Sequence, residues 1–253
     1  MADISVREHI CWPPNKPSEP TSTIVLTSPE RRFVDIRILK PTSTGGTSGD
    51  ILPLSRLDWA IAGTSSTVWL ATSDCAPGER VRRSKWHHWI DSRTPNAEHV
   101  IDEGDVFAHP SDSSLELERG RMVNPETGVE ADYEELWRSE PIAHGSPHQL
   151  PGEPPAPCLV LQWSSEEGDD CPTGPRRGLV IRLGQYCQAF VRDGNEITVE
   201  RLMWVPDEQT WHQQVRIGKR ELPTEFATHL AHEARIDDEV KVGGEVWKVV
   251  EKA

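Results

Sequence analysis

The chain has 253 residues, with 27 basic and 41 acidic side chains and a formal net charge of −14 at pH 7. Hydrophobic residues make up 36% of the chain and are well spread, which excludes a wholly disordered protein. No apolar run approaches the ~20 residues of a membrane-spanning helix, and an acidic chain without a basic block is unsuited to nucleic acid, so we expect neither a membrane span nor a nucleic-acid partner.

The first half of the sequence predicts mainly strands. In residues 33–39 apolar side chains alternate with Asp35 and Arg37, as in a strand with one apolar face. Tyr133 and two apolar residues after it are spaced i, i+3, i+4, which predicts a short helix over 131–138. Further short runs rich in β-branched and aromatic residues predict strands at 23–27, 57–63, 67–71, 85–91 and 114–118, and a turn at 124–128.

A proline-rich stretch divides the sequence. Residues 141–157 contain six prolines, a density that blocks both helices and sheet ladders. We therefore expect an N-terminal β-barrel domain over 1–140, an extended linker over 141–157 and a C-terminal β-barrel domain over 158–253. Residues 41–53, rich in Gly, Ser and Thr, predict a loop.

The second half repeats the style of the first. Residues 223–231 predict the best helix of the chain, with Thr224 as its N-cap. Strands are predicted at 159–163, 178–192, 196–205, 211–217 and 245–250, with hairpin turns at 193–195 and 242–245. Many short strands and few helices predict a mainly β fold of antiparallel sandwiches or barrels.

The five cysteines are scattered and form no Cys-x-x-Cys pair. This spacing argues against a disulfide framework and against a structural zinc site. The first residues lack the pattern of a secretory signal. The simplest expectation is a reducing, cytoplasmic location.

The densest cluster of chemically active side chains is residues 85–93. On a strand, Trp86 and His88 share one face, while His87, Trp89 and Asp91 share the other. A buried imidazole transfers protons near neutral pH, so His88 is a candidate catalytic residue. The alternative is a structural pair of tryptophans with one exposed histidine.

A second aromatic region comprises residues 200–206 and 211–217, considered together with residues 185–191. Tyr186 and Gln213 are candidate catalytic hydrogen-bond donors there. Tryptophan, methionine and glutamine side chains together suit an apolar small-molecule cavity, although an ordinary barrel core has the same composition. The candidate substrate-binding residues over the whole chain are Trp59, Trp69, Trp86, Trp163, Gln188, Met203, Trp204 and Trp211.

Motifs for other chemistry are missing from the sequence. There is no nucleophile elbow, phosphate loop or dinucleotide loop, and no His spacing typical of a metal site. We therefore expect no cofactor and no metal. The acidic runs 102–105 and 237–239 are most simply solvated loops, with a basic protein partner as the alternative.

Several segments together resemble the fungal Hri family, named from a yeast protein that interacts with a casein-kinase-I homologue. They are residues 33–39, 57–63, 86–93, 103–106 and, above all, 120–137, with looser matches at 178–192 and 197–204. The resemblance implies two lipocalin-like antiparallel β-barrels with few short helices. One branch of relatives comprises fungal hetero-Diels–Alderases of tropolone–sesquiterpenoid biosynthesis.

That branch implies a cofactor-independent pericyclase of fungal secondary metabolism. It would join a tropolone quinone methide to a humulene-type alkene, two small apolar substrates, in a pocket lined by tryptophan. Hydrogen-bond donors on the quinone-methide oxygen would lower the barrier. The alternative is a non-catalytic two-barrel protein that binds a protein partner or a small lipophile, and a homodimer stays open in either case.

Overall fold

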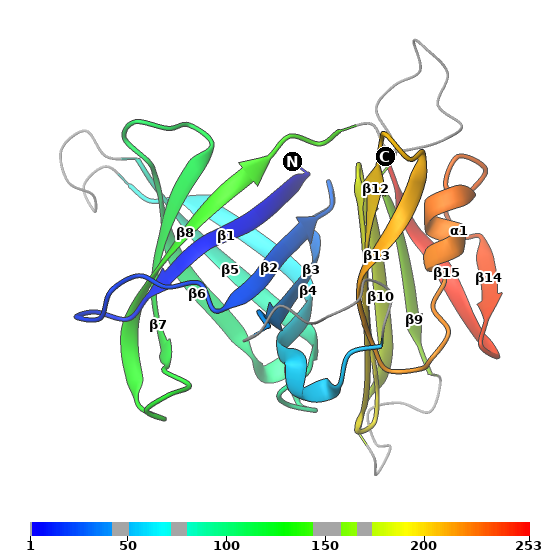
Figure 1. The fold of residues 1–253 in the computed structure, drawn as a ribbon, viewed down its shortest axis with the longest axis horizontal. Coiled ribbons are helices and arrows are strands. Elements are labelled where there is room, and N and C mark those ends of the chain that lie inside the picture. Colours follow the sequence, from blue (N-terminus) through cyan, green and yellow to red (C-terminus); the bar gives the residue numbers. More distant parts are fainter. Residues whose placement is uncertain (1, 42–50, 72–79, 144–157, 166–173) are drawn as a thin grey trace.

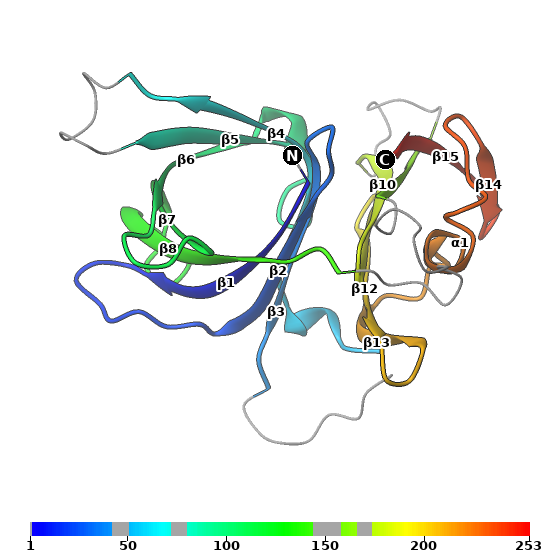
Figure 2. The ribbon, with the colours of Figure 1, turned by 90° about the horizontal axis from the view of Figure 1, so that it is seen from above.

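The computed structural model describes residues 2–41, 51–71, 80–143, 158–165 and 174–253. Within them, eight antiparallel strands close into a barrel in sequence order (Figures 1 and 2). The strands are β1 (Asp3–Cys11), β2 (Thr21–Thr27), β3 (Arg32–Leu39), β4 (Leu57–Trp69), β5 (Val81–Asp91), β6 (Ile101–Ala108), β7 (Leu115–Val123) and β8 (Glu130–Glu140). The 3₁₀ turn η1 (Leu54–Arg56) precedes β4, and the 3₁₀ turn η3 (Ala97–His99) precedes β6.

The described strands of the second half form a seven-stranded antiparallel sheet of order β13-β12-β11-β10-β9-β15-β14. Their bounds are β9 (Leu159–Ser164), β10 (Arg176–Leu183), β11 (Tyr186–Asp193), β12 (Glu196–Val205), β13 (Thr210–Ile217), β14 (Glu239–Val242) and β15 (Glu245–Lys252). The helix α1 (Thr224–His229) lies between β13 and β14 in the chain. Figure 1 shows it on the side of the sheet away from the barrel.

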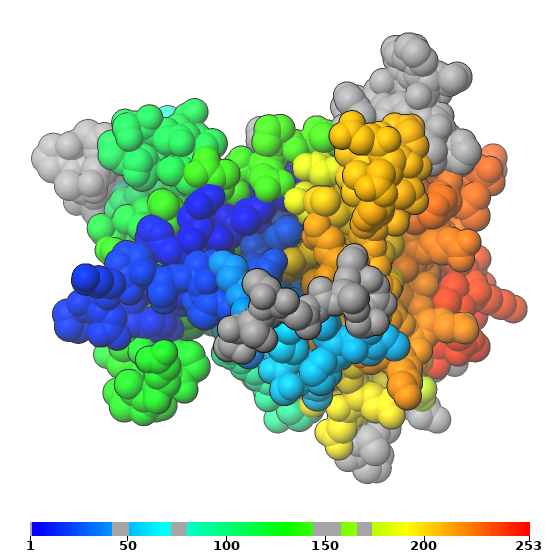
Figure 3. Space-filling model, in the orientation of Figure 1, coloured from blue at the N-terminus to red at the C-terminus, as the bar shows by residue number. Residues whose placement is uncertain are grey.

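The barrel and the sheet share one hydrophobic core. Apolar side chains on the outside of β1–β5 pack against one face of β9–β13, and the two halves adjoin over the height of the molecule (Figure 3). From the barrel come Ile4, Ile24, Leu26, Val34, Ile36, Ile38, Ala60, Ala62 and Ile90, and from the sheet Val160, Leu179, Ile181, Leu183, Phe190, Val199, Val215 and Ile217. The outer face of this barrel is therefore apolar where the sheet covers it.

The far face of the sheet carries a second core. Trp163, Trp247 and Leu161 pack there against Ala227 of α1 and Ala231 just after it. These groups fill the side of the sheet that a second barrel would enclose. The fold is mainly β, as predicted, but the described strands of the second half form an open sheet instead of a second closed barrel.

The predicted helix over 131–138 is wrong, because these residues belong to strand β8. The helical spacing of Tyr133 and its apolar neighbours is coincidental, and the period of two places Tyr133 and Glu135 on the buried side of the strand. Strands β1, β6 and β14 were not predicted, and the two runs 57–63 and 67–71 form the single long strand β4. The run 178–192, predicted as one strand, forms the two strands β10 and β11.

The second predicted helix is shorter than expected. It covers Thr224–His229, and Pro223 occupies the N-cap position that was predicted for Thr224. The Thr224 hydroxyl donates to Glu200 Oε2 at 2.5 Å, so this side chain links the helix to β12 instead of capping it.

The chain passes from the barrel to the sheet between Glu140 and Leu159. Most of the predicted linker, residues 144–157, lies outside the described residues, as do Cys75, Cys171 and most of the predicted loop 41–53. Cys11, Cys158 and Cys187 are buried and form no disulfide. Within the described part of the chain, the helices are too short to cross a membrane.

Candidate functional site

The interior of the barrel, called the lumen below, contains a cavity of about 370 Å³. Strand alternation sends every second side chain into it. On β3 the inward residues are Phe33, Asp35 and Arg37, while Val34 and Ile36 face the shared core. The polar face predicted for residues 33–39 therefore points into the barrel and not into solvent.

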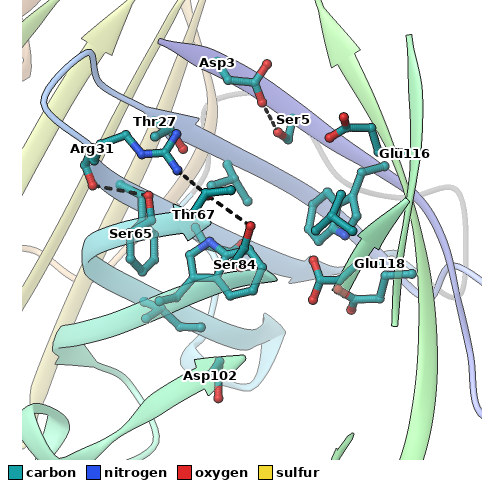
Figure 4. A pocket seen from close by; sticks show the side chains of 18 of the residues that line it. Asp3, Ser5, Thr27, Arg31, Ser65, Thr67, Ser84, Asp102, Glu116 and Glu118 are labelled. Atoms are coloured by element: carbon teal, nitrogen blue, oxygen red, sulfur yellow. Dashed lines mark hydrogen bonds between the residues drawn. The ribbon is translucent and has the colours of Figure 1, made fainter. Parts of the chain in front are cut away.

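Polar side chains surround the end of the lumen where β1 and β3 begin. Asp3 and Ser5 on β1 contact each other there (Figure 4). Arg31 donates to Thr67 Oγ1 at 2.6 Å, and the hydroxyls of Thr67 and Ser84 are 3.1 Å apart. Thr67 is exposed, and Asp3 and Ser5 are half-buried, so this end, called the mouth below, is accessible to solvent.

One wall of the lumen is apolar. Phe33, Trp59 and Ile61 are buried there, and Trp86 and Met122 pack against them. The face of Trp86 is the accessible aromatic surface, because Trp59 is enclosed by the guanidinium groups of Arg37 and Arg93. Their carbons lie 5.2 and 4.1 Å from the Trp59 ring centre. Flat organic molecules favour such a wall.

His88 lies between two carboxylates. Its Nδ1 is 2.9 Å from Asp91 Oδ2, and its Nε2 is 3.1 Å from Asp102 Oδ2. Burial lowers the pKa of His88, but the hydrogen bonds to Asp102 and Asp91 outweigh this effect and raise the pKa to about 9. At neutral pH the ring is therefore an imidazolium that donates from both nitrogens.

The contact between His88 and Asp91 depends on a bulge in β5. Ala62 of β4 pairs with Ile90, whereas the next residue, Gly63, pairs with His88, so Trp89 is the extra residue. The bulge turns Asp91 to the same side as His88, where it also accepts from Trp59 Nε1 at 2.9 Å. The prediction that Asp91 and His88 lie on opposite faces is wrong for this reason.

A network of ion pairs lies deeper in the lumen. Arg37 donates to Asp35 Oδ2 at 2.9 Å and contacts Glu135 at 3.5 Å. Arg7 donates to the same oxygen of Glu135 at 2.5 Å and to Glu19 at 2.8 Å. Each arginine is thus matched by two carboxylates, as buried guanidinium groups require.

Glu118 on β7 has a different environment. Tyr133 donates its phenolic O–H to Glu118 Oε1 at 2.8 Å. Burial and the neighbouring Glu135 carboxylate raise the pKa of Glu118 to about 8, against the opposing effects of Tyr133 and Arg37. The carboxyl group is therefore mostly protonated at neutral pH, and it is a second proton donor in the lumen.

Of the residues predicted from the sequence, three line the lumen together: His88, Trp59 and Trp86. Trp69 lies at the end of β4, 58% exposed, with Arg80 over its ring at 4.4 Å. It belongs to the projecting part of the β4–β5 hairpin and not to the lumen (Figure 2).

The remaining predicted residues belong to the second sheet. Tyr186, Gln188 and Met203 face the barrel and lie in or against the shared core, where Gln188 donates to the carbonyls of Ile24 and Val34 at 3.0 and 2.9 Å. Trp163 contacts Trp247. Trp204 and Trp211 contact each other, and Gln213 lies on the same strand as Trp211. These residues do not line the lumen.

Several residues that line the lumen were not predicted as site residues, namely the charged or ionisable Asp35, Arg37, Glu118 and Glu135 and the phenol of Tyr133. A usable signal was present. Glu116 and Glu118 alternate with leucines in residues 114–118. Asp35 and Arg37 alternate in the same way with valine and isoleucine in residues 33–39. The charged faces of these strands carried no site prediction, because charged side chains on a strand usually lie in solvent.

Comparisons with known proteins give one family and one fold. The model of the family described as Protein HRI1 matches residues 3–251. Proteins named Protein HRI1 from Saccharomyces cerevisiae strains YJM789 and RM11-1a are 26% identical over 200 residues, covering 75% of this chain and 73% of theirs.

The crystal structure of an uncharacterised protein of Saccharomyces cerevisiae matches with a TM-score of 0.70. The match covers 100% of this chain and 99% of that chain at 19% identity. At that identity, it shows a shared fold alone.

Proposed function

The chain belongs to the HRI1 family, and from this premise we propose that it binds a small, partly aromatic organic molecule in the lumen of β1–β8. The observation that carries this proposal is a cavity of about 370 Å³ with an aromatic wall and oriented polar groups. This volume and mixture of surfaces are typical of small-molecule sites. The lumen is more polar than the tryptophan-lined pocket expected from the sequence.

The buried charges of the lumen support the proposal further. A barrel stabilised by its interior alone would be filled with apolar side chains, since buried ions add little net stability. Here His88, Asp35, Arg37 and Glu118 are nearly inaccessible, yet all line an open cavity. Such groups are retained where they orient a ligand.

A variant that fills the lumen tests this proposal. Ser84 points inward on β5, whereas Ser66, on the adjacent strand, points outward and is exposed. We expect small aromatic amines, alcohols and acids that bind the wild type in saturation-transfer NMR to lose binding to Ser84→Phe and to keep it with Ser66→Phe. Equal binding to both variants, or no binding to the wild type, would overturn the proposal.

A second candidate function is the cofactor-free hetero-Diels–Alderase reaction. It is favoured by two proton donors, His88 and Glu118, in the cavity that Trp86 lines. A donor placed on the oxygen of a quinone methide stabilises the charge that develops there, and the wall orients the alkene. Tyr186 and Gln213, the other two predicted catalytic residues, lie outside this cavity.

Incubation with the quinone-methide precursor and humulenol tests this second function. We expect the wild type to raise the adduct yield and to favour one stereoisomer, and His88→Gln to lose most of this effect. Yield and stereochemistry equal to those in buffer alone would exclude the reaction. They would leave the binding function standing, because binding is measured separately.

A further inference from the structure

Carboxyl groups outnumber cations in the lumen. Among the described residues that line it, the acidic ones are Asp3, Asp35, Asp102, Glu116, Glu118 and Glu135, and the basic ones are Arg31, Arg37, Arg82 and His88. The inner cations are already matched: Arg37 contacts Asp35 and Glu135, and His88 contacts Asp91 and Asp102. The excess in the lumen is therefore negative.

Two of the inner carboxyl groups have unused hydrogen-bonding capacity. Asp35 is 4% exposed, and its Oδ1 atom has no hydrogen-bond partner among the described residues. Glu118 is 6% exposed, and the hydrogen bond from Tyr133 is the only one to its carboxyl group in the described part of the chain. A buried acceptor without a donor is costly, so a ligand that donates there gains affinity.

Two glycines make room for this arrangement. A Cβ atom on Gly104 would lie 2.8 Å from Glu118 Cγ, and one on Gly120 would lie 2.5 Å from Tyr133 Oη. A larger residue at position 104 would displace the Glu118 side chain, and one at position 120 would displace the Tyr133 ring. The position of Glu118 is thus built by three strands, β6, β7 and β8.

Asp35 and Glu118 approach the cavity from different sides. Their strands, β3 and β7, are four positions apart in the closed ring of eight, which places them on opposite walls. Phe33 of β3, Trp86 of β5 and Met122 of β7 supply apolar surface from one of these walls to the other. A group with several N–H donors and a positive charge can reach both carboxyl groups while its hydrocarbon body lies on that surface.

We propose that the lumen selects an organic cation, a protonated primary amine on an aromatic body, whose ammonium group is held by Glu118 and Asp35. This inference rests on the proposed binding function and names its ligand class. The ammonium supplies the donor that Asp35 Oδ1 lacks. Its positive charge is balanced by Glu118, which gives up its proton to the solvent when the amine enters.

The proton release follows from the groups that face Glu118. Burial opposes its ionisation most strongly, and Glu135 on β8 and Asp102 on β6 add to this effect. Tyr133 on β8 and Arg37 on β3 favour ionisation, and the balance keeps the carboxyl group protonated. An added positive charge beside it reverses this balance. At pH 7 we expect the release of about one proton per bound amine.

Three ligands of one shape and three charges test the inference on the wild-type protein: 2-phenylethylamine, 2-phenylethanol and phenylacetate. In calorimetry at pH 7, we expect the amine to bind at least about tenfold more tightly than the alcohol, and phenylacetate to bind most weakly. Titrations of the amine in phosphate and in Tris, which differ in ionisation enthalpy, report the proton release.

Substitutions of single carboxyl groups show which residue determines the affinity for the amine and the proton release. Glu118→Gln should lose the proton release and about tenfold of the affinity for the amine, and it should still bind the alcohol. Glu134→Gln, a carboxyl group on the neighbouring strand β8 that pairs with the exposed Arg119 outside the lumen, is the matched control and should change neither value substantially. The comparison of the amine, the alcohol and phenylacetate on the wild type tests the ligand class even where a variant folds poorly.

Two results would overturn this inference. If the alcohol or phenylacetate binds as tightly as the amine, the ligand class is wrong and the lumen-binding function stands. If the amine binds most tightly but Glu118→Gln keeps both its affinity and its proton release, the assignment to Glu118 is wrong. Failure of all three ligands, together with failure of the wider compound set above, would reject the binding function itself.

Discussion

The buried ionisable side chains of the lumen make the protein sensitive to pH at the level of single residues. His88 is held as a cation by Asp91 and Asp102, while Glu118 is held neutral by burial and by Glu135. Both groups keep a proton in the folded state at pH values where the unfolded chain has lost it. By linkage, both contributions to stability decline as the pH rises.

For His88 we expect the substitution His88→Gln to lower the free energy of unfolding by about 3 kcal/mol at pH 6, because it removes the cation between the buried carboxylate of Asp91 and the half-buried carboxylate of Asp102. The pKa of His88 is raised from 6.5 to about 9, so this stabilisation is complete below about pH 6.5 and is lost as the pH passes 9. Urea unfolding at several pH values measures the difference. His87→Gln, an exposed neighbour, is the control, and an equal cost at pH 6 and pH 10 would contradict the account.

For Glu118 we expect Glu118→Gln to reduce the loss of stability between pH 5 and pH 8. The pKa of this carboxyl group rises from 4.5 to about 8 on folding, so its contribution to stability is full below pH 4.5 and declines through pH 8. Glutamine stays neutral throughout and still accepts from Tyr133. Guanidinium midpoints at the two pH values check this, and parallel declines in wild type and variant would show that Glu118 titrates normally.

At the scale of elements, the β4–β5 pair determines where His88 points. Gly63 lies beside the bulge, and a Cβ atom there would be 2.0 Å from the His87 carbonyl oxygen, a contact that the backbone cannot relieve without moving. The same pairing brings Asp91 to His88. A backbone feature thus creates the imidazolium site.

We expect Gly63→Ala to destabilise the fold by about 2–3 kcal/mol, because the added methyl group forces the two strands apart. The separation should also move His88 away from Asp91 and lower the pKa of its ring, which NMR titration of the imidazole measures. Ser66→Ala, an exposed change on the same strand, should have little effect on either quantity. An unchanged His88 pKa in a folded Gly63→Ala protein would contradict this role of the bulge.

The sequence predicted single strands well and their environment poorly. The alternation in β3 was recognised from residues 33–39, and β2, β9, β12 and β13 were placed near their observed bounds. In β8, however, Glu135 is an inward residue that resembles a solvent-exposed one, and the helical spacing around Tyr133 competed with the correct period. Polar residues inside a barrel invert the usual pattern, so a single sequence does not show which face is enclosed.

Three site residues were predicted from the sequence: His88, Trp59 and Trp86. His88 and Trp86 are conspicuous because an imidazole and an indole share one strand, and Trp59 was selected as a tryptophan. Asp35 and Glu118 were not predicted, because the residues that surround them in the lumen come from strands distant in the chain. The expected pocket residues of the second half were recognised as large and buried, but burial alone does not distinguish a core from a cavity.

At the scale of the whole molecule, a buried arginine joins the sheet to the barrel. Arg201 on β12 is 1% exposed and donates to Gln188 at 2.8 Å, to Ser22 Oγ at 3.0 Å and to the Ile36 carbonyl at 2.6 Å. Burial lowers the pKa of Arg201 to about 10. Because the two halves also share a hydrophobic core, we expect them to unfold together.

We expect Arg201→Met to lower the free energy of unfolding by about 3 kcal/mol, because three acceptors lose their donor inside the interface. The wild type should show one transition when far-UV circular dichroism and tryptophan fluorescence are compared. Arg119→Met, which removes an exposed ion pair with Glu134, is the control and should cost less than about 1 kcal/mol. Two separate transitions in the wild type would disprove the coupling of barrel and sheet.

The most direct test of the account is where a ligand acts on the indole groups of the protein. In ¹⁵N-labelled protein, we expect 2-phenylethylamine to shift the indole N–H signals of Trp86 and Trp137, which line the lumen. The signals of Trp163, Trp204, Trp211 and Trp247, which belong to the second sheet, should stay in place. Shifts confined to the second sheet, or no shift at saturating amine, would contradict a ligand site in the barrel.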